Sequence, residues 1–109
     1  MVIWHNTVDA SRIPEYVAAG QEVELWIGTY PVEGGQSVWL EITLYTVDGR
    51  ELFCKMPAQW HSNNEQRGNS YWTINLGSFD SGDRLEYRVY GSKGEDLISC
   101  NETFSFEVG

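Results

Sequence analysis

Positive charge is scarce in this chain. Its 109 residues include 7 lysines and arginines against 16 aspartates and glutamates, which gives a formal net charge of −9 at pH 7. A nucleic-acid backbone and an anionic membrane surface would both repel such a chain. We therefore expect no nucleic acid and no membrane among its partners, whereas neutral ligands, cations and basic proteins stay open. The simplest role of the charge is self-repulsion that keeps the chain soluble.

Long apolar runs are absent as well. The first ten residues, MVIWHNTVDA, lack the basic stretch and apolar run of a signal peptide. No segment reaches the roughly 18 consecutive apolar residues that cross a membrane as a helix. Because a strand-like segment begins almost at once, we expect residues 1–109 to form a single β-sandwich domain excised from a larger chain. The compartment stays unknown on these grounds, with an extracellular one slightly favoured.

Cysteine and histidine are few, and their positions are Cys54, Cys100, His5 and His61. They form neither a CxxC pair nor a zinc-type pattern, so we expect no metal and no cofactor. Two free thiols are predicted, with a disulfide as the alternative in a secreted protein. Cys54 alternates in phase with apolar neighbours, which places it in the core. Both histidines are expected to face solvent or to hydrogen-bond loop backbone.

Motifs for catalysis are missing too. No serine stands in a GxSxG motif, and no glycine-rich loop opens a helix for phosphate binding. The acidic side chains fall on alternating strand faces and turn tips, whereas glycoside hydrolysis needs two of them across a cleft. We therefore expect no catalytic residue and no enzymatic activity of the chain by itself. Asp80, Asp83 and Asp96 lie in turns, where capping of the turn is favoured over Ca²⁺ binding.

What the chain does have is a regular alternation of apolar and polar residues. It is clearest in residues 71–90, YWTINLGSFDSGDRLEYRVY, on both sides of a turn at 77–83. A period of two is typical of β-strands that bury one face. The same alternation occurs in residues 22–27, 37–47 and 104–108.

These strands together indicate the fold class. About seven of them, turn signals every ~8–12 residues and no amphipathic helix predict an all-β fold, an antiparallel immunoglobulin-like β-sandwich of about seven strands. Asp48-Gly49 is the strongest hairpin signal. Residues 57–70 are interpreted as a long polar loop that carries Trp60. Trp72 and Tyr87 are predicted to be buried.

The segment 71–91 also carries a resemblance. Tyr71-Trp72, Gly82-Asp83, the strand LEYRV at 85–89 and Gly91 resemble the N-terminal immunoglobulin-like modules of amylolytic glycoside hydrolases. Those modules are carbohydrate-binding or accessory domains. The resemblance, which covers about a fifth of the chain, implies a module beside a catalytic domain that binds α-glucan or only packs on its neighbour. A likeness to the corner of such sandwiches implies that the Tyr87 hydroxyl bonds back to the turn at Gly82.

Aromatic rings on the polar faces of the strands are the candidates for binding. Sugars present apolar C–H faces on which flat rings stack, while nearby polar groups bond the hydroxyls. In the immunoglobulin order, the strand that holds Trp39 lies beside the strand that holds Tyr90. The candidate carbohydrate-binding residues are Trp39, Tyr45, Tyr90, Arg88, Glu86 and Trp60. Trp26 and Tyr71 are further rings on polar faces.

The same rings also suit packing on a neighbouring domain or cross-strand pairing that stabilises the sheet, and both roles stay open. We predict a monomeric, non-catalytic carbohydrate-binding or accessory module of an enzyme active on α-glucan. Its expected partners are a neutral polysaccharide or oligosaccharide and a neighbouring domain of the parent protein. The alternative is an immunoglobulin- or fibronectin-like domain for protein–protein interaction or adhesion.

Overall fold

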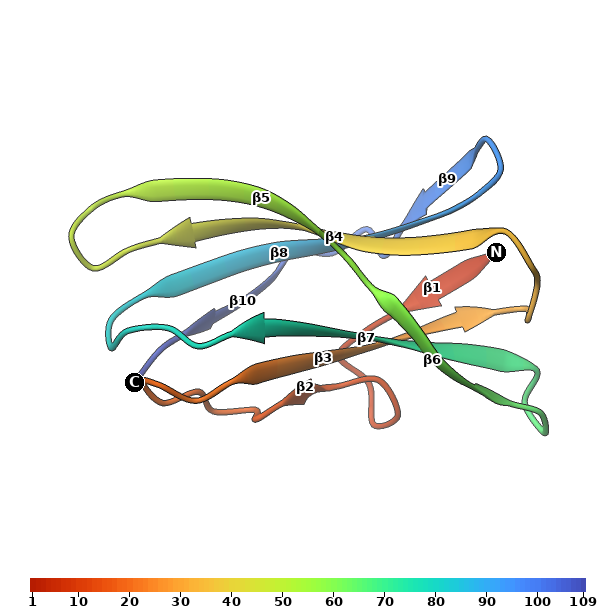
Figure 1. The fold of residues 1–109 in the computed structure, drawn as a ribbon, viewed down its shortest axis with the longest axis horizontal. Coiled ribbons are helices and arrows are strands. Elements are labelled where there is room, and N and C mark those ends of the chain that lie inside the picture. Colours follow the sequence, from red (N-terminus) through yellow and green to blue (C-terminus); the bar gives the residue numbers. More distant parts are fainter.

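The computed structural model describes all 109 residues and contains ten β-strands in two antiparallel sheets (Figure 1). The predicted all-β sandwich is therefore confirmed, with ten strands in place of about seven. No helix is present, and hence none that is long and apolar enough to span a membrane.

The strands divide into two sheets of five. Sheet I contains, in spatial order, β1 (Val2–Trp4), β3 (Val23–Tyr30), β7 (Asn69–Gly77) and β6 (Gln59–Asn64), with β2 (Arg12–Ile13) paired to β3. Sheet II contains β10 (Phe104–Glu107), β8 (Arg84–Lys93), β4 (Gln36–Tyr45) and β5 (Glu51–Pro57), with β9 (Asp96–Ser99) paired to β8. These two orders follow the A-B-E-D and G-F-C-C′ orders of immunoglobulin-type sheets.

Residues 57–70 are mostly strand, so their interpretation as a loop is wrong. β6 pairs with β7, and only Ala58 separates β6 from β5. The chain thus passes from sheet II to sheet I without a turn (Figure 1). Alternation did not reveal β6 because it is an edge strand with polar or exposed side chains on both faces. Its backbone hydrogen bonds, which the sequence does not display, hold it in the sheet.

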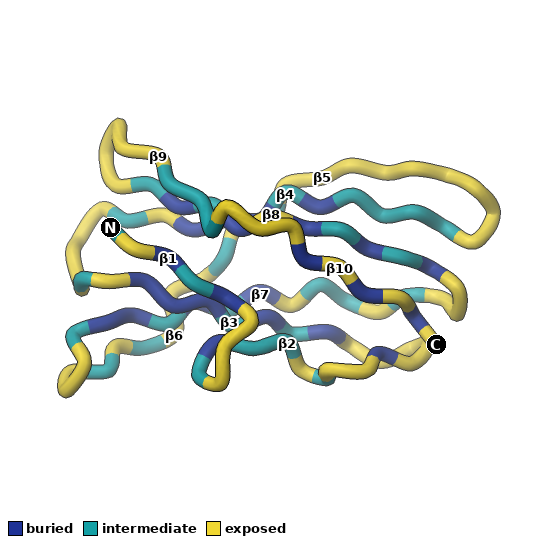
Figure 2. Tube along the Cα trace, turned by 180° about the vertical axis from the view of Figure 1, so that it is seen from behind, coloured by how far each residue is buried: buried dark blue, intermediate teal, exposed yellow.

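The core lies between the sheets and is built from the alternating rows. Sixteen buried apolar residues form one cluster, to which β3, β4, β7, β8 and β10 contribute their inward positions. Trp72 and Tyr87 are both in this cluster, as predicted. Along β3, β4 and β8 the tube of Figure 2 alternates between buried and more accessible positions.

Cys54 is exposed, and its predicted place in the core is wrong. It faces the same side of sheet II as Ile42, its partner in register on β4. However, β5 is the edge strand, and six of its seven residues are exposed (Figure 2). Alternation predicts the face of a side chain but not whether the opposite sheet covers it. Both cysteines are free, as predicted, and burial raises the pKa of the Cys100 thiol to about 11.

One buried imidazole connects the two sheets, contrary to the expectation that His5 faces solvent or a loop. His5 Nδ1 lies 2.7 Å from the carbonyl oxygen of Trp26 on β3, and Nε2 lies 2.8 Å from the Tyr87 hydroxyl on β8. Because a carbonyl oxygen can only accept, Nδ1 carries the proton and Nε2 accepts from the hydroxyl. Tyr87 therefore bonds to the loop after β1 instead of the corner at Gly82.

The buried His5 makes the stability of the fold sensitive to pH. Desolvation lowers the pKa of His5 below its ordinary 6.5. The unfolded chain therefore binds more protons than the folded one below pH 6.5, and the free energy of unfolding decreases as the pH falls through this range. The slope reaches at most ~1.4 kcal/mol per pH unit. Chemical denaturation between pH 7.5 and 5 should show this loss, and a His5→Gln chain with an equally steep loss would assign it to other groups.

Two tryptophans in register on neighbouring strands provide a test of the core. Trp72 on β7 is 9% exposed and donates from its indole to Thr29 Oγ1 at 2.9 Å, whereas its partner Trp60 on β6 is 56% exposed. Trp72→Ala should lower the free energy of unfolding by ~3–5 kcal/mol because it leaves a cavity and an unpaired hydroxyl. Trp60→Ala, the matched control, should cost less than ~1 kcal/mol. Equal denaturation midpoints for the two variants would contradict this assignment of the core.

Candidate functional site

The outer face of sheet II carries five of the six candidate residues. The strands that hold Trp39 and Tyr90, β4 and β8, are neighbours, as the immunoglobulin order predicted, and the two residues are in register. Their rings are nearly parallel, with centroids 6.0 Å apart and planes at 13°. Both residues are half-buried. The two stacked rings lie toward one end of the face, and each is held in place by the other and by its own strand.

Charged side chains occupy the middle of this face. Glu41 lies between Arg88 on β8 and Lys55 on β5 in the register of the strands, and it pairs with Lys55 at 3.5 Å. Arg88 is exposed and makes no side-chain hydrogen bond or ion pair within the chain. Its guanidinium therefore keeps all its donors for a ligand or for water.

Tyr45 and Glu86 lie toward the opposite end of the face, where Arg84 contacts both side chains. The Arg84 guanidinium sits 4.2 Å from the centroid of the Tyr45 ring and forms an ion pair with Glu86. The hydrogen bond from Arg84 to Glu86 raises the Arg84 pKa. The Tyr45 hydroxyl donates to Glu86 at 3.4 Å. One face of the Tyr45 ring is thus covered, and Glu86 already has partners, so this end is less free than the Trp39 end.

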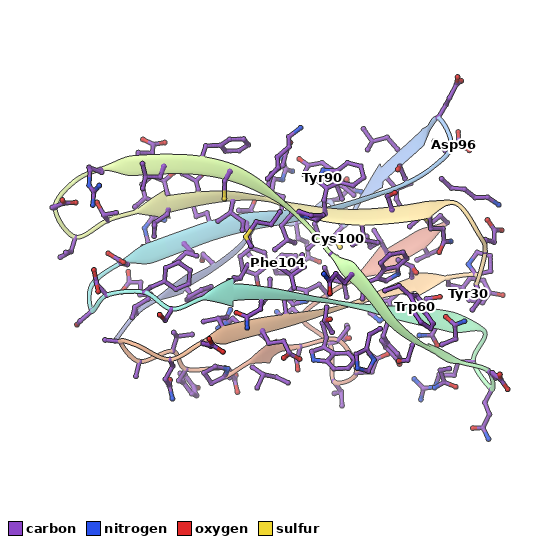
Figure 3. All side chains as sticks on the ribbon, in the orientation of Figure 1. Tyr30, Trp60, Tyr90, Asp96, Cys100 and Phe104 are labelled. Atoms are coloured by element: carbon purple, nitrogen blue, oxygen red, sulfur yellow. The ribbon has the colours of Figure 1, made fainter.

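Trp60 does not lie with the other candidates. It belongs to β6 in sheet I, away from Tyr90 in sheet II (Figure 3), and its indole N–H donates to Asn63 Oδ1 at 2.9 Å. The structure therefore groups Trp39, Tyr90 and Arg88 closely, adds Tyr45 and Glu86 on the same sheet face, and leaves Trp60 apart.

A second group of rings lies on the outer face of sheet I. It is centred on Trp26 of β3. The ring centroids of His61 on β6 and Tyr71 on β7 lie within 6.2 Å of the centroid of the Trp26 ring. The polar-face positions of Trp26 and Tyr71 were visible in the alternation. The contribution of His61 was not, because it comes from the segment interpreted as a loop.

Asp83 caps a turn, as expected, whereas Asp96 is the first residue of β9 and not part of a turn. The buried carboxylate of Asp83 accepts from the backbone N–H of Val47 at 3.1 Å and of Asp80 at 3.0 Å, which joins the β4–β5 hairpin to the turn before β8. The structure places no three His, Cys, Asp or Glu side chains together in an arrangement that could hold a metal ion.

Comparison with known proteins identifies what the chain resembles. No family model matches it. Isomaltosyltransferase of Sporosarcina globispora is 35% identical over 97 residues, which are 89% of this chain and 8% of that protein. The cycloalternan-forming enzyme of Listeria monocytogenes, solved with a pentasaccharide substrate, superposes with a TM-score of 0.83 at 30% identity. That match covers 99% of this chain and 10% of the enzyme.

A Listeria monocytogenes protein crystallised with α- and β-D-glucose, magnesium and calcium matches equally, with a TM-score of 0.83, 30% identity and coverage of 99% of this chain and 10% of that one. The chain spans about a tenth or less of the length of these relatives. The resemblance carried by residues 71–91 is thus confirmed, because nearly the whole chain is similar to a small accessory domain of α-glucan-active enzymes.

Proposed function

We propose that the chain is a non-catalytic module that binds α-glucan on the outer face of sheet II and belongs to a larger glycan-active enzyme. The observation that carries the proposal is the Trp39–Tyr90 ring pair beside the unengaged Arg88, in a chain similar to part of an isomaltosyltransferase and of a cycloalternan-forming enzyme. Its share of these relatives, 8–10%, agrees with a role outside the catalytic domain.

The chemistry of this face suits a neutral sugar chain. A pyranose unit would place its C–H face on the Trp39–Tyr90 rings, and Arg88 would donate to its hydroxyls. Trp39 and Tyr45 are six residues apart on β4, which corresponds to ~20 Å and allows several units to lie along the strand. The net charge of −9 carries no Coulomb penalty for a neutral ligand. An open face buries little of its ligand, so the expected affinity is micromolar to millimolar, about −4 to −8 kcal/mol.

A different surface favours the alternative, a protein–protein or domain-packing role. An apolar opening of about 280 Å³ lies at the β5 edge of the sandwich, lined by Ile42, Leu44, Leu52, Phe53, Cys54, Met56, Leu76, Phe79 and Leu85. Leu52 is 47% and Phe53 62% exposed. Exposed apolar patches of this kind are typical of contacts with protein. The two roles use different surfaces and can be tested separately.

Substitution of Trp39 tests the sugar-binding role. Trp39→Ala should remove binding of maltooligosaccharides and isomaltooligosaccharides at millimolar concentration, because it deletes the larger ring of the pair and frees Tyr90 to move. Arg88→Ala should weaken binding about tenfold, the value of one good hydrogen bond to a charged group. Isothermal titration calorimetry provides the measurement.

Tyr16→Ala is the matched control, since Tyr16 is an 86% exposed ring in the loop before β3. This variant should bind the saccharide as tightly as the unsubstituted chain does. Unchanged affinity of the Trp39→Ala chain, with its fold intact by circular dichroism, would refute sugar binding by the Trp39–Tyr90 pair. Absence of heat with every α-glucan would favour domain packing instead.

A further inference from the structure

The outer face of sheet I carries its own ring cluster. We define the Trp26 cluster as Trp4, Trp26, His61 and Tyr71, which come from four different strands. The Trp26 ring lies 4.4 Å from the His61 ring and 6.2 Å from the Tyr71 ring, centroid to centroid. None of these four residues joins the core. Aromatic rings gathered on a solvent-facing sheet surface therefore point to a role other than core packing.

Local irregularity of the backbone puts His61 into the cluster. The register of β6 against β7 shifts between Trp60 and Ser62, so that Ser62 is the residue opposite Tyr71. Such bulges turn a side chain away from its regular direction and are frequent next to binding sites. Here the bulge brings the exposed His61 onto Trp26, which lies two strands away across β7.

A glycine makes room for the fourth ring. Gly28 on β3 stands between Trp4 on β1 and Tyr71 on β7 in the register. A Cβ atom at this position would lie 2.1 Å from Cε2 of the Trp4 indole. The indole therefore rests directly on the backbone of β3, and any larger residue at position 28 would displace it.

Carboxylates fix the polar ends of the rings. The Trp26 indole N–H donates to Glu24 Oε1, and the Tyr71 hydroxyl donates to Asp9 Oδ2 at 2.8 Å. Asp9 also accepts from Thr7, and these bonds, that from Thr7 foremost, lower the Asp9 pKa. The rings are thus held in place before any ligand arrives, which reduces the entropy lost on binding.

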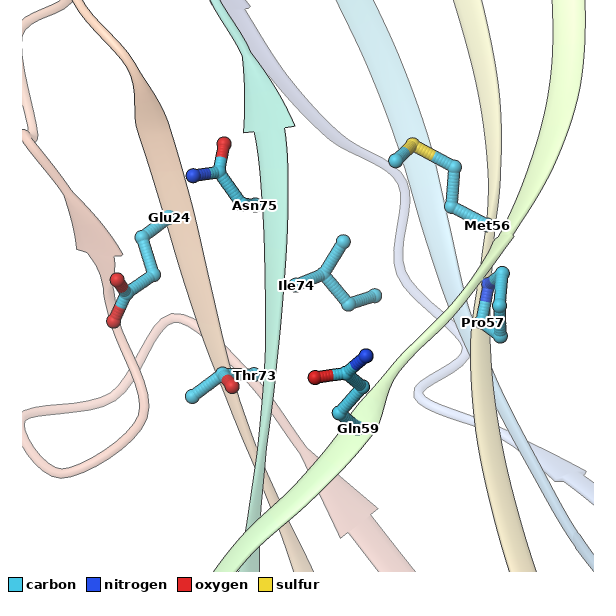
Figure 4. Close-up of a pocket in the computed structure, with 7 residues that line it drawn as sticks. All are labelled: Glu24, Met56, Pro57, Gln59, Thr73, Ile74 and Asn75. Carbon is cyan, nitrogen blue, oxygen red and sulfur yellow. The ribbon is translucent and has the colours of Figure 1, made fainter.

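A polar groove adjoins the cluster where β6 separates from β7 (Figure 4). It has a volume of about 280 Å³, and Glu24, Gln59, Thr73 and Asn75 line it together with Met56, Pro57 and Ile74. Thr73 is the register partner of Trp26 on one side and of Gln59 on the other, so the groove and the cluster are continuous. Amides, a hydroxyl and a carboxylate offer both donors and acceptors, as sugar hydroxyls require.

We propose that the outer face of sheet I is a second saccharide site, which binds an α-glucan independently of the Trp39–Tyr90 pair on sheet II. One pyranose unit occupies the groove and is hydrogen-bonded by Glu24, Gln59 and Asn75, and the next unit packs on the rings of the Trp26 cluster. The proposal rests on the proposed function only for the class of ligand. Since the two outer faces look away from each other across the sandwich, the chain can hold two glucan segments at once.

Polar lining distinguishes this face from a protein-docking surface. Four of the seven residues that line the groove beside the Trp26 cluster are polar, whereas all nine around the opening at β5 are hydrophobic. Interfaces between domains exclude charge from their centre. Glu24 lies at the junction of groove and rings, and it therefore favours a hydroxyl-rich ligand over an apolar protein surface.

The five tryptophans allow both faces to be followed in the unmodified chain. Each indole N–H gives its own signal in a ¹⁵N–¹H spectrum, and the protein is titrated with maltooligosaccharides and isomaltooligosaccharides. We expect the Trp26 signal to shift together with that of Trp39, while the signal of the buried Trp72 stays in place. A Trp39 shift without a Trp26 shift would overturn the second site and leave the proposed function standing. A Trp26 shift alone would support the second site and refute sugar binding by the Trp39–Tyr90 pair, and no shift at either tryptophan would refute both sites.

Variants on the exposed edge strand give the second measurement without risk to the core. His61→Ala and Gln59→Ala should each weaken the response at Trp26 about tenfold and leave the response at Trp39 unchanged. Trp39→Ala should leave the Trp26 titration as it is, and Tyr16→Ala serves again as the control. A Trp26 response that survives both edge-strand substitutions at full strength would overturn the site as assigned.

Discussion

The buried imidazole of His5 links the two sheets of the sandwich through hydrogen bonds. Its Nδ1–H is bound by the backbone of β3 in sheet I, and its Nε2 is bound by the Tyr87 hydroxyl of β8 in sheet II. The bond to the Trp26 carbonyl also fixes the backbone from which the Trp26 indole projects to the outer face. A neutral histidine in the core, with its proton on Nδ1 so that Nε2 can accept from Tyr87, thereby supports the spacing of the sheets and one of the two ring clusters.

Much of the fold could be predicted because several strands follow a regular alternation of apolar and polar residues. The inward rows of β3, β4 and β8 follow from the period of two, and the adjacency of Trp39 and Tyr90 follows from the strand order. Properties of sheet edges could not be predicted in this way. Cys54 alternates like a core residue but lies on an uncovered edge strand, and β6 lacks an apolar face although its backbone pairs with β7.

The candidate sites show the same limit at the level of side chains. Strand order and alternation predicted that Trp39 and Tyr90 would share a face of neighbouring strands. They could not predict that Arg84 would cover Tyr45 and engage Glu86. The Trp26 cluster depends on a bulge at His61 and on the space above Gly28, and neither has a signal in composition or periodicity. The cause in each case is contact between residues on different strands, which only the folded backbone defines.

The uncovered edge of β5 has a consequence for the colloidal behaviour of the protein. An edge strand with free backbone groups and exposed Leu52 and Phe53 is a template for pairing with another copy, and Lys55 and Pro57 are residue types that natural edges use to discourage this. At neutral pH the net charge of −9 keeps copies apart. Near the isoelectric point of about 4.4 this repulsion vanishes, and salt weakens it at any pH. At neutral pH the acidic composition thus opposes the approach of a second copy to an edge that the fold leaves open.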